Sequence, residues 1–135
     1  MMSAGGTFKS TSPIQVCCAS ISFEYQQDQG SLSAGFEATV ICCGCCPFAN
    51  IHAQQQFAPD YTRFNIMDHK GFTTQGVLES FDQDKRLATY SYSGMSEKGY
   101  KAGTWFYDGR ANTVTYIQTT PKVSTRHGTV TMERV

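Results

Sequence analysis

The feature that most constrains the fold is a run of alternating polar and apolar residues, interrupted by turn residues, between Tyr61 and Gln118. The turns are Asp-His-Lys-Gly at 68–71, Asp-Gln-Asp-Lys at 82–85 and a region that begins with Asp-Gly at 108–109. Asp and Gly tolerate the backbone angles of a hairpin, and the segments between the turns are rich in Tyr, Phe, Val and Thr. The pattern predicts consecutive strands joined by tight turns.

The first half of the chain alternates in the same way over residues 17–26 and 32–43. Apolar residues occupy every second position in both segments, which is typical of a sheet with one buried face. A register that places Tyr25 opposite Leu32 brings the two apolar faces together. A slip of one residue would separate them, so the pattern predicts a hairpin in this register.

A more polar strand is predicted over residues 50–58. Across the next turn, pairing Met67 with Phe72 places Phe64 on the same face as Val77. The sequence therefore predicts that Val77 points into the same core as Phe64.

Two later turns extend this face. Pairing Phe81 with Arg86 adds three residues of the following strand, Ala88, Tyr90 and Tyr92. After Tyr107, a loop of two or four residues places Trp105 with Tyr116, whereas an odd loop would split them. Because these choices agree with one another, we predict one continuous meander.

No segment shows helical periodicity, so the sequence predicts a single all-β domain over residues 1–135. Eight to ten strands in succession indicate an antiparallel up-and-down meander that forms a β-barrel or a strongly curved sheet. Residues 1–12 are expected to be a flexible tail or a loosely docked first strand. Residues 93–99 are expected to be a longer connection. Residues 122–135 are expected to be a last strand with a bulge, or a short hairpin.

Charge and composition exclude several classes of function. The chain carries 11 basic and 11 acidic residues and has a formal net charge of zero, so nucleic acid is not an expected partner. The longest apolar runs are too short to cross a bilayer, and residues 1–13 lack the apolar segment of a secretory signal. We therefore expect a cytoplasmic protein whose six cysteines are thiols or ligands rather than disulfides.

Two segments, Gly-Val-Leu-Glu-Ser-Phe-Asp at 76–82 and Gly-Thr-Trp-Phe-Tyr-Asp-Gly at 103–109, resemble a known pattern. The pattern is that of small lipocalin-like (calycin-type) barrel proteins of unknown function. In those proteins, a strand that ends in an aromatic-Asp turn is followed by a Gly-Thr-Trp strand and an acidic turn. The resemblance covers the second half of the chain and implies a calycin-type barrel that has room for a cavity. It implies no catalytic residue, and the cysteine-rich first half departs from the pattern.

The cysteine cluster contains two overlapping C-x-x-C pairs, Cys42 with Cys45 and Cys43 with Cys46. This spacing lets two thiolates bind one tetrahedral zinc ion, and a closed site would need further ligands, for which the register offers Cys17 or Cys18. Two other interpretations are redox or acyl modification of the thiols and plain packing of small apolar side chains.

The second half supplies aromatic residues for a ligand pocket. In a barrel wide enough to hold a cavity, these rings line it, and their hydroxyl and indole N–H groups orient a ligand. In a filled barrel, the same rings pack on one another. The residues predicted to line the pocket are Phe64, Val77, Tyr90, Tyr92, Trp105, Tyr107 and Tyr116.

The predicted register also places Glu79 inside the barrel, where a carboxylate needs a partner, water or a ligand. Arg126 is the partner we would expect first. A local bulge that turns Glu79 outward is the alternative. No Ser-His-Asp arrangement, phosphate loop or pair of carboxylates is recognisable, so an enzyme is the less favoured class.

Three hypotheses about function follow. The first is a barrel that holds a small hydrophobic or amphipathic molecule. The second is a structural or interaction domain with a packed core, whose cysteines bind zinc or carry acyl chains. The third is an isomerase or lyase that uses Glu79 as general base. The sequence leaves the ligand and the oligomeric state open.

Overall fold

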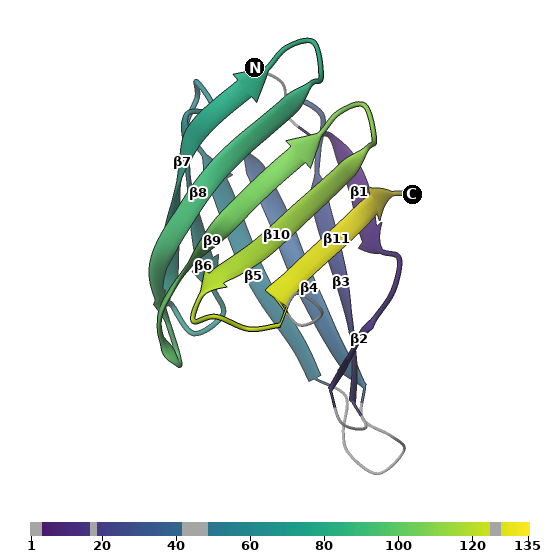
Figure 1. Cartoon of the computed structure of the whole chain (residues 1–135), viewed down its shortest axis with the longest axis vertical. Helices are drawn as coiled ribbons and strands as arrows, with labels where there is room; N and C mark the ends of the chain where they lie inside the picture. Colours follow the sequence, from purple (N-terminus) through teal and green to yellow (C-terminus); the bar gives the residue numbers. More distant parts are fainter. Residues whose placement is uncertain (1–3, 17–18, 42–48, 125–127) are drawn as a thin grey trace.

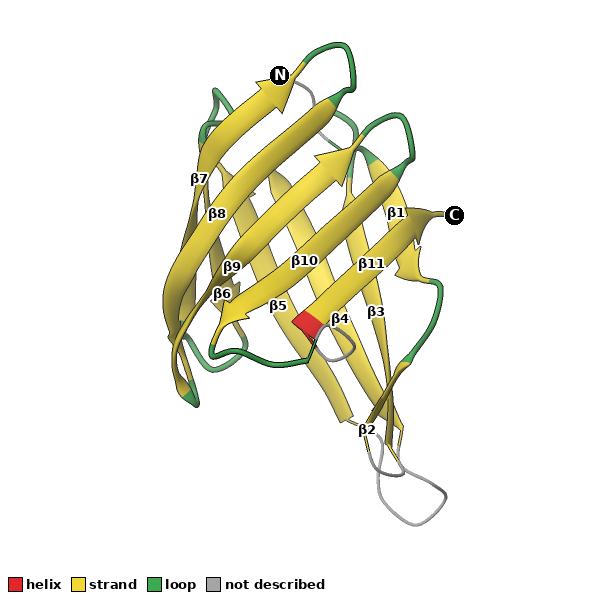
Figure 2. Ribbon diagram, in the orientation of Figure 1, coloured by secondary structure: helices red, strands yellow, loops and turns green. Residues whose placement is uncertain are grey.

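The structure, a computed structural model, describes residues 4–16, 19–41, 49–124 and 128–135. The described residues form eleven strands, and ten of these close into an antiparallel barrel in meander order (Figure 1). Short loops join most of the strands (Figure 2), and the all-β up-and-down meander is confirmed in its barrel form. The strands are β1 (Gly6–Ser10), β2 (Ile14–Val16), β3 (Ala19–Gln27), β4 (Ser33–Ile41), β5 (Ala49–Phe57), β6 (Arg63–Asp68), β7 (Thr73–Asp82), β8 (Leu87–Ser96), β9 (Gly99–Asp108), β10 (Thr113–Thr120) and β11 (Thr129–Arg134).

Strand β1 closes the barrel by pairing with two strands that are far apart in the sequence. Its Phe8 lies opposite Arg134 of β11 on one side and opposite Tyr25 of β3 on the other, and the ring is fully buried. β2 pairs with the other part of β3. Residues 6–10 are therefore an integral strand, and the prediction of a flexible tail is wrong for them. Pairing on both sides covers the edges that β3 and β11 would otherwise expose.

The pairing of β9 with β10 is the one predicted for the aromatic face, and β8 pairs with the other side of β9. Trp105 lies opposite Tyr90 of β8 and Tyr116 of β10, and Tyr107 lies opposite Val114. The loop between β9 and β10 has the even length that this pairing needs, because β9 ends at 108 and β10 begins at 113.

The hairpin of β3 and β4 has the predicted faces but a different register, since Tyr25 lies opposite Phe36 and not Leu32. The cause is the buried amide of Gln27. Its Oε1 accepts a hydrogen bond from the Tyr25 hydroxyl (2.9 Å), and its Nε2 donates to the Ser31 carbonyl (2.8 Å). The turn is thus fixed around a polar side chain that hydropathy alone does not place inside. Because the register differs by an even number of residues, the inward residues remain inward.

In the hairpin of β6 and β7, the predicted register is wrong by one residue. Met67 pairs with Thr73 instead of Phe72. A carboxylate oxygen of Asp68 accepts hydrogen bonds from two backbone N–H groups of the turn (2.9 and 3.0 Å), and these bonds define a wider turn. An odd shift exchanges the faces, so Val77 points outward and is 48% exposed.

A β-bulge between Leu78 and Ser80 changes the phase of β7 relative to β8. Beyond the bulge, Phe81 lies opposite Ala88, two residues after the predicted partner Arg86. The bulge lets both Leu78 and Phe81 pack against the core, although three positions separate them.

The predicted long connection at 93–99 is wrong. β8 and β9 continue to Ser96 and Gly99, which pair across a two-residue turn. Gly99 has a φ of 106°, which non-glycine residues rarely adopt, so this glycine permits the tight reversal.

Aromatic rings fill one half of the barrel. Trp105 packs edge-on against Phe57, Phe64 and Tyr90, with ring centroids 5.8, 5.7 and 5.3 Å away. Edge-on pairs of this kind stabilise a core beyond the effect of buried area alone. This half contains only a gap of about 10 Å³ among its described residues.

Arg134 covers the filled end. Its guanidinium lies 4.7 Å from the centre of the Phe8 ring and donates hydrogen bonds to the backbone carbonyls of Ala4 and Gly5. It therefore ties the first described residues of the chain to the last strand.

We expect Phe8→Ala to lower the free energy of unfolding by about 3–5 kcal/mol, because it removes a fully buried ring and leaves a cavity. Lys9→Ala changes an exposed neighbour on the same strand and should stay within about 0.5 kcal/mol of the wild type. Urea unfolding followed by the fluorescence of the single tryptophan measures both. Equal effects of the two substitutions would contradict the closure of the barrel by β1.

Gly103→Ala is also expected to be destabilising, by about 1–3 kcal/mol, since a Cβ at this position would overlap the carbonyl oxygen of Ile117 and the phenol of Tyr92. Gly35→Ala is the matched control in β4, where a Cβ meets no atom within 4 Å. That substitution should be neutral or stabilising by roughly 0.5–1 kcal/mol. Thermal unfolding of both variants tests the contrast, and a tolerant Gly103 would show that β9 and β10 pack less closely.

Candidate ligand cavity

A cavity of about 380 Å³ occupies the half of the barrel that the aromatic rings do not fill. It lies at the end that carries the β6–β7 and β8–β9 turns, and its mouth is beside Phe72 and Met95, which are 36% and 53% exposed. Most of its lining is apolar. The other apolar lining residues are Ile14, Ile21, Phe23, Phe36, Ile51, Ala53, Ile66 and Val130, of which Ile51 is 42% exposed.

Side-chain size explains why this half is open. Inward positions near the mouth are small, with Ala53 on β5 and Thr74 on β7. Inward positions in the other half include Phe57 of β5 and Tyr90 of β8. A ring of ten strands is wide enough that small residues leave its interior unfilled.

Another hollow, of about 450 Å³, lies on the outside of the barrel. It is lined by the β1–β2 connection and by Thr129 and Thr131 of β11, which alternate with the inward Val130. Because Thr129 and Thr131 face away from the barrel interior, this hollow lies on the surface, and the interior cavity is the better candidate for a ligand site.

The aromatic residues of the second half were expected either to line a cavity or to pack on one another, and each expectation describes a different half of the barrel. Tyr92 and Tyr116 line the cavity, as predicted for pocket residues. The other predicted aromatic residues lie in the packed half and contact one another or Phe8 instead. These residues are Phe64, Tyr90, Trp105 and Tyr107.

A polar layer separates the cavity from the packed half. The Tyr116 hydroxyl donates to Oε1 of the buried Gln55 (3.1 Å), and the Tyr92 hydroxyl donates to the Ile117 carbonyl (3.3 Å). Among the described residues, the Nε2 group of Gln55 and the Nε1 group of Trp105 have no hydrogen-bond partner. Tyr92 and Tyr116 line the cavity above these buried groups and form its floor.

Negative charge is unfavourable at this floor. Burial raises the pKa of Tyr92 to about 12. Burial also raises the pKa of Tyr116 strongly, and the neighbouring Tyr92 adds to the effect. An anionic group at the same depth would meet the same loss of hydration, so the inner part of the cavity suits an uncharged group.

The charged groups that line the cavity are both near its mouth. Asp68 has one carboxylate oxygen engaged by the backbone of its own turn. Lys101 is on the same, inward face of β9 as Gly103 and Trp105, and it lies opposite Gly94 of β8. It forms no ion pair with a described residue. The cavity is therefore apolar along most of its depth and polar at its opening.

The structure does not place the other predicted site residues in the cavity. Val77 points outward. Glu79 is exposed at the bulge, where its carboxylate accepts a hydrogen bond from the Ser91 hydroxyl (2.6 Å). The prediction of an inward Glu79 is wrong, and the alternative of an outward bulge is what the structure contains. Arg126 lies outside the described residues. The isomerase or lyase hypothesis thereby loses its proposed base.

The cysteine predictions at 17, 18, 42, 43, 45 and 46 also lie outside the described residues. Within the described part of the chain, no group of three or more His, Cys, Asp or Glu side chains is placed to hold a metal ion. His52 is exposed and lies 3.9 Å from Glu37 on the barrel surface.

The sequence reasoning missed Lys101 and Gln118 as lining residues and did not assign Phe36 or Ile66 to a pocket. Alternation shows which face of a strand a residue occupies but not how far along the barrel axis it lies. The order of turns in a meander contains that information, because successive turns lie at opposite ends. Counting positions from each turn would have grouped these residues near one end.

Comparison of the chain with protein-family models, with curated proteins and with solved structures found no match. Within the described residues, no helix has the length and apolar character needed to cross a membrane.

The pKa of Tyr92 implies a specific dependence of stability on pH. The unfolded chain releases this proton near pH 10.0 and the folded chain near pH 12, so the contribution of Tyr92 to the free energy of unfolding should be constant below about pH 10 and fall above it. The slope is at most about 1.4 kcal/mol per pH unit for each tyrosine of this kind. Urea unfolding at a series of alkaline pH values measures the decline, and Tyr92→Phe should make it shallower. An unchanged slope in this variant would contradict the assignment.

Proposed function

We propose that the protein binds a small amphipathic molecule inside the barrel, with the apolar part of the molecule in the cavity and its polar part at the mouth. The observation that carries the proposal is an apolar cavity of about 380 Å³ inside a closed barrel, open at one end. This volume is within the range of cavities that take up small ligands, roughly 300–1,000 Å³.

The distribution of polar groups supports the orientation of the ligand. Burial disfavours charge at the floor around Tyr116, whereas Asp68, Lys101 and Gln118 offer polar contacts at the opening. A molecule that entered polar end first would leave its charge without hydration or a counter-ion. The apolar end therefore enters first.

The hypothesis of a solid structural core fits only the half of the barrel around Trp105. The barrel architecture and the resemblance of residues 76–82 and 103–109 support a grouping with lipocalin-like binding proteins, which remains part of the proposal.

A neutral dye, N-phenyl-1-naphthylamine, tests binding because its fluorescence rises in an apolar site. We expect the wild type to bind the dye and Ala53→Trp to bind it at least about tenfold more weakly, since the indole would fill the cavity. Gln54→Trp is the matched control, because its position is the next one in β5 and points outward. Thermal unfolding verifies that both variants are folded.

Equal dye binding by the wild type and Ala53→Trp would contradict the proposed site. Native mass spectrometry of the protein as expressed provides an independent reading. A bound organic mass that is absent from Ala53→Trp supports the same assignment.

A further inference from the structure

A group of exposed apolar side chains lies beside the mouth of the cavity. Met67, Phe72, Met95 and Tyr100 are 53%, 36%, 53% and 56% exposed, and we refer to them as the rim. Single exposed apolar residues are ordinary on protein surfaces, whereas a cluster of them next to a cavity marks an interaction surface.

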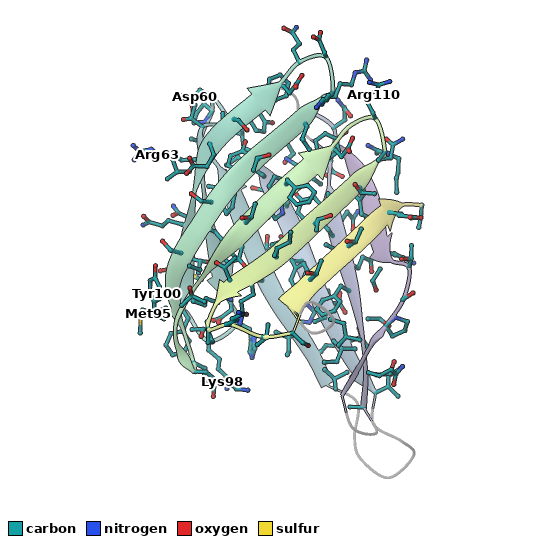
Figure 3. The ribbon with its side chains drawn as sticks, in the orientation of Figure 1. Asp60, Arg63, Met95, Lys98, Tyr100 and Arg110 are labelled. Atoms are coloured by element: carbon teal, nitrogen blue, oxygen red, sulfur yellow. The ribbon has the colours of Figure 1, made fainter. Side chains whose placement is uncertain are left out.

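Three rim residues form a row across four adjacent strands, in which Thr73 is the member from β7 and Phe72 is the residue just before it. Met67 pairs with Thr73, and Met95 pairs with Tyr100. Because Thr74 pairs with Gly94, the next position brings Thr73 beside Met95. The row therefore runs from β6 to β9 on the outward face, and Figure 3 shows Met95 and Tyr100 together at one end of the barrel.

The rim is continuous with the cavity. Phe72 and Met95 belong to the rim and also line the cavity mouth. The β6–β7 and β8–β9 turns beside them are joined by an ion pair between Lys70 and Glu97 (2.7 Å). A ligand that leaves the cavity at this side passes directly over the exposed apolar side chains.

The described residues at the mouth include Lys70, Lys98 and Lys101 against Asp68 and Glu97, so basic side chains are in slight excess beside the rim. Neither Lys98, at the tip of the β8–β9 turn, nor Lys101 forms an ion pair with a described residue. The opposite end of the barrel is more acidic. Its four described turns, within residues 28–32, 58–62, 82–86 and 108–112, contain five aspartates against Lys85, Arg86 and Arg110. The field of the protein thus favours approach of an anionic surface to the mouth.

We infer that the rim docks on an anionic lipid bilayer, so that the cavity exchanges its ligand with the membrane surface. Met67, Phe72, Met95 and Tyr100 enter the region between headgroups and acyl chains, while Lys98 and Lys101 contact anionic headgroups. The inference rests on the proposed function, because it takes the cavity mouth as the opening for the ligand.

Co-flotation with lipid vesicles tests this inference. We expect the protein to float with vesicles of phosphatidylcholine and phosphatidylserine, to bind more weakly to phosphatidylcholine alone, and to dissociate as the salt concentration rises. Lys98→Glu should weaken binding to the anionic vesicles by about fivefold or more. Arg110→Glu is the matched control, because it makes the same change in net charge at the opposite end of the barrel (Figure 3) and should leave binding unchanged.

The apolar contribution has its own pair of variants. Met67→Gln should weaken vesicle binding by about fivefold or more, because it removes an apolar side chain from the bilayer contact without changing a residue that lines the cavity. Val77→Gln should not, since Val77 is similarly exposed but lies on the outside of β7 between Arg63 and Ser91, away from the mouth.

The outcomes separate this inference from the proposed function. Dye binding in the cavity without vesicle binding overturns membrane docking alone and favours a protein partner for the rim. Equal binding to neutral and anionic vesicles, or equal loss in Lys98→Glu and Arg110→Glu, also overturns it. Failure to bind the dye overturns the proposed function, and the exchange role of the rim with it. Anionic-vesicle binding that falls selectively in Lys98→Glu and Met67→Gln, with dye binding retained, supports the inference.

Discussion

Closure of the sheet by β1 is the constraint on which the rest of the structure depends. Without this strand, β3 and β11 would expose unpaired backbone groups, and the ring that gives the interior its width would be open. β1 also contributes to the core it encloses, since Phe8 packs against Tyr25 and Tyr107 with ring centroids 6.0 and 6.2 Å away. The guanidinium of Arg134 covers the same ring. Backbone hydrogen bonding, aromatic packing and the contact between the first and last described strands therefore all occur where β1 pairs with β3 and β11.

Once ten strands fix the circumference, the side chains decide which part of the interior is solid. Large rings around Trp105 fill one half, and small residues such as Ala53 and Thr74 leave the other half open. The layer of Gln55 and Tyr116 lies between them, and it couples the two halves through a hydrogen bond between distant strands. A packed half gives the barrel a rigid base, so the open half can keep its shape without side chains filling it.

The sequence was sufficient for the fold class, for the faces of β3, β4, β9 and β10, and for two cavity residues, Tyr92 and Tyr116. It was insufficient where a side chain binds the backbone of a turn. Gln27 and Asp68 set their turns through hydrogen bonds that hydropathy does not reveal, and in the case of Asp68 an odd shift reversed the orientation of Val77. The bulge at Glu79 acted in the same way. The alternation of polar and apolar residues does not show how far along the barrel axis a residue lies. For this reason, most of the cavity lining was missed.

The position of each turn along the barrel axis also determines which surface residues surround the cavity mouth. In a meander, every second turn lies at the same end of the barrel. The β6–β7 and β8–β9 turns therefore meet, although 25 or more positions separate their residues, and Lys70 and Glu97 form an ion pair between them. The acidic turns collect at the filled end for the same reason. One end is therefore packed and rich in aspartate, and the other is open, apolar and bordered by Lys98 and Lys101, which form no ion pair with a described residue. Phe72 and Met95 belong to both the cavity and the outer surface, so a partner that covers this surface also contacts whatever occupies the cavity mouth.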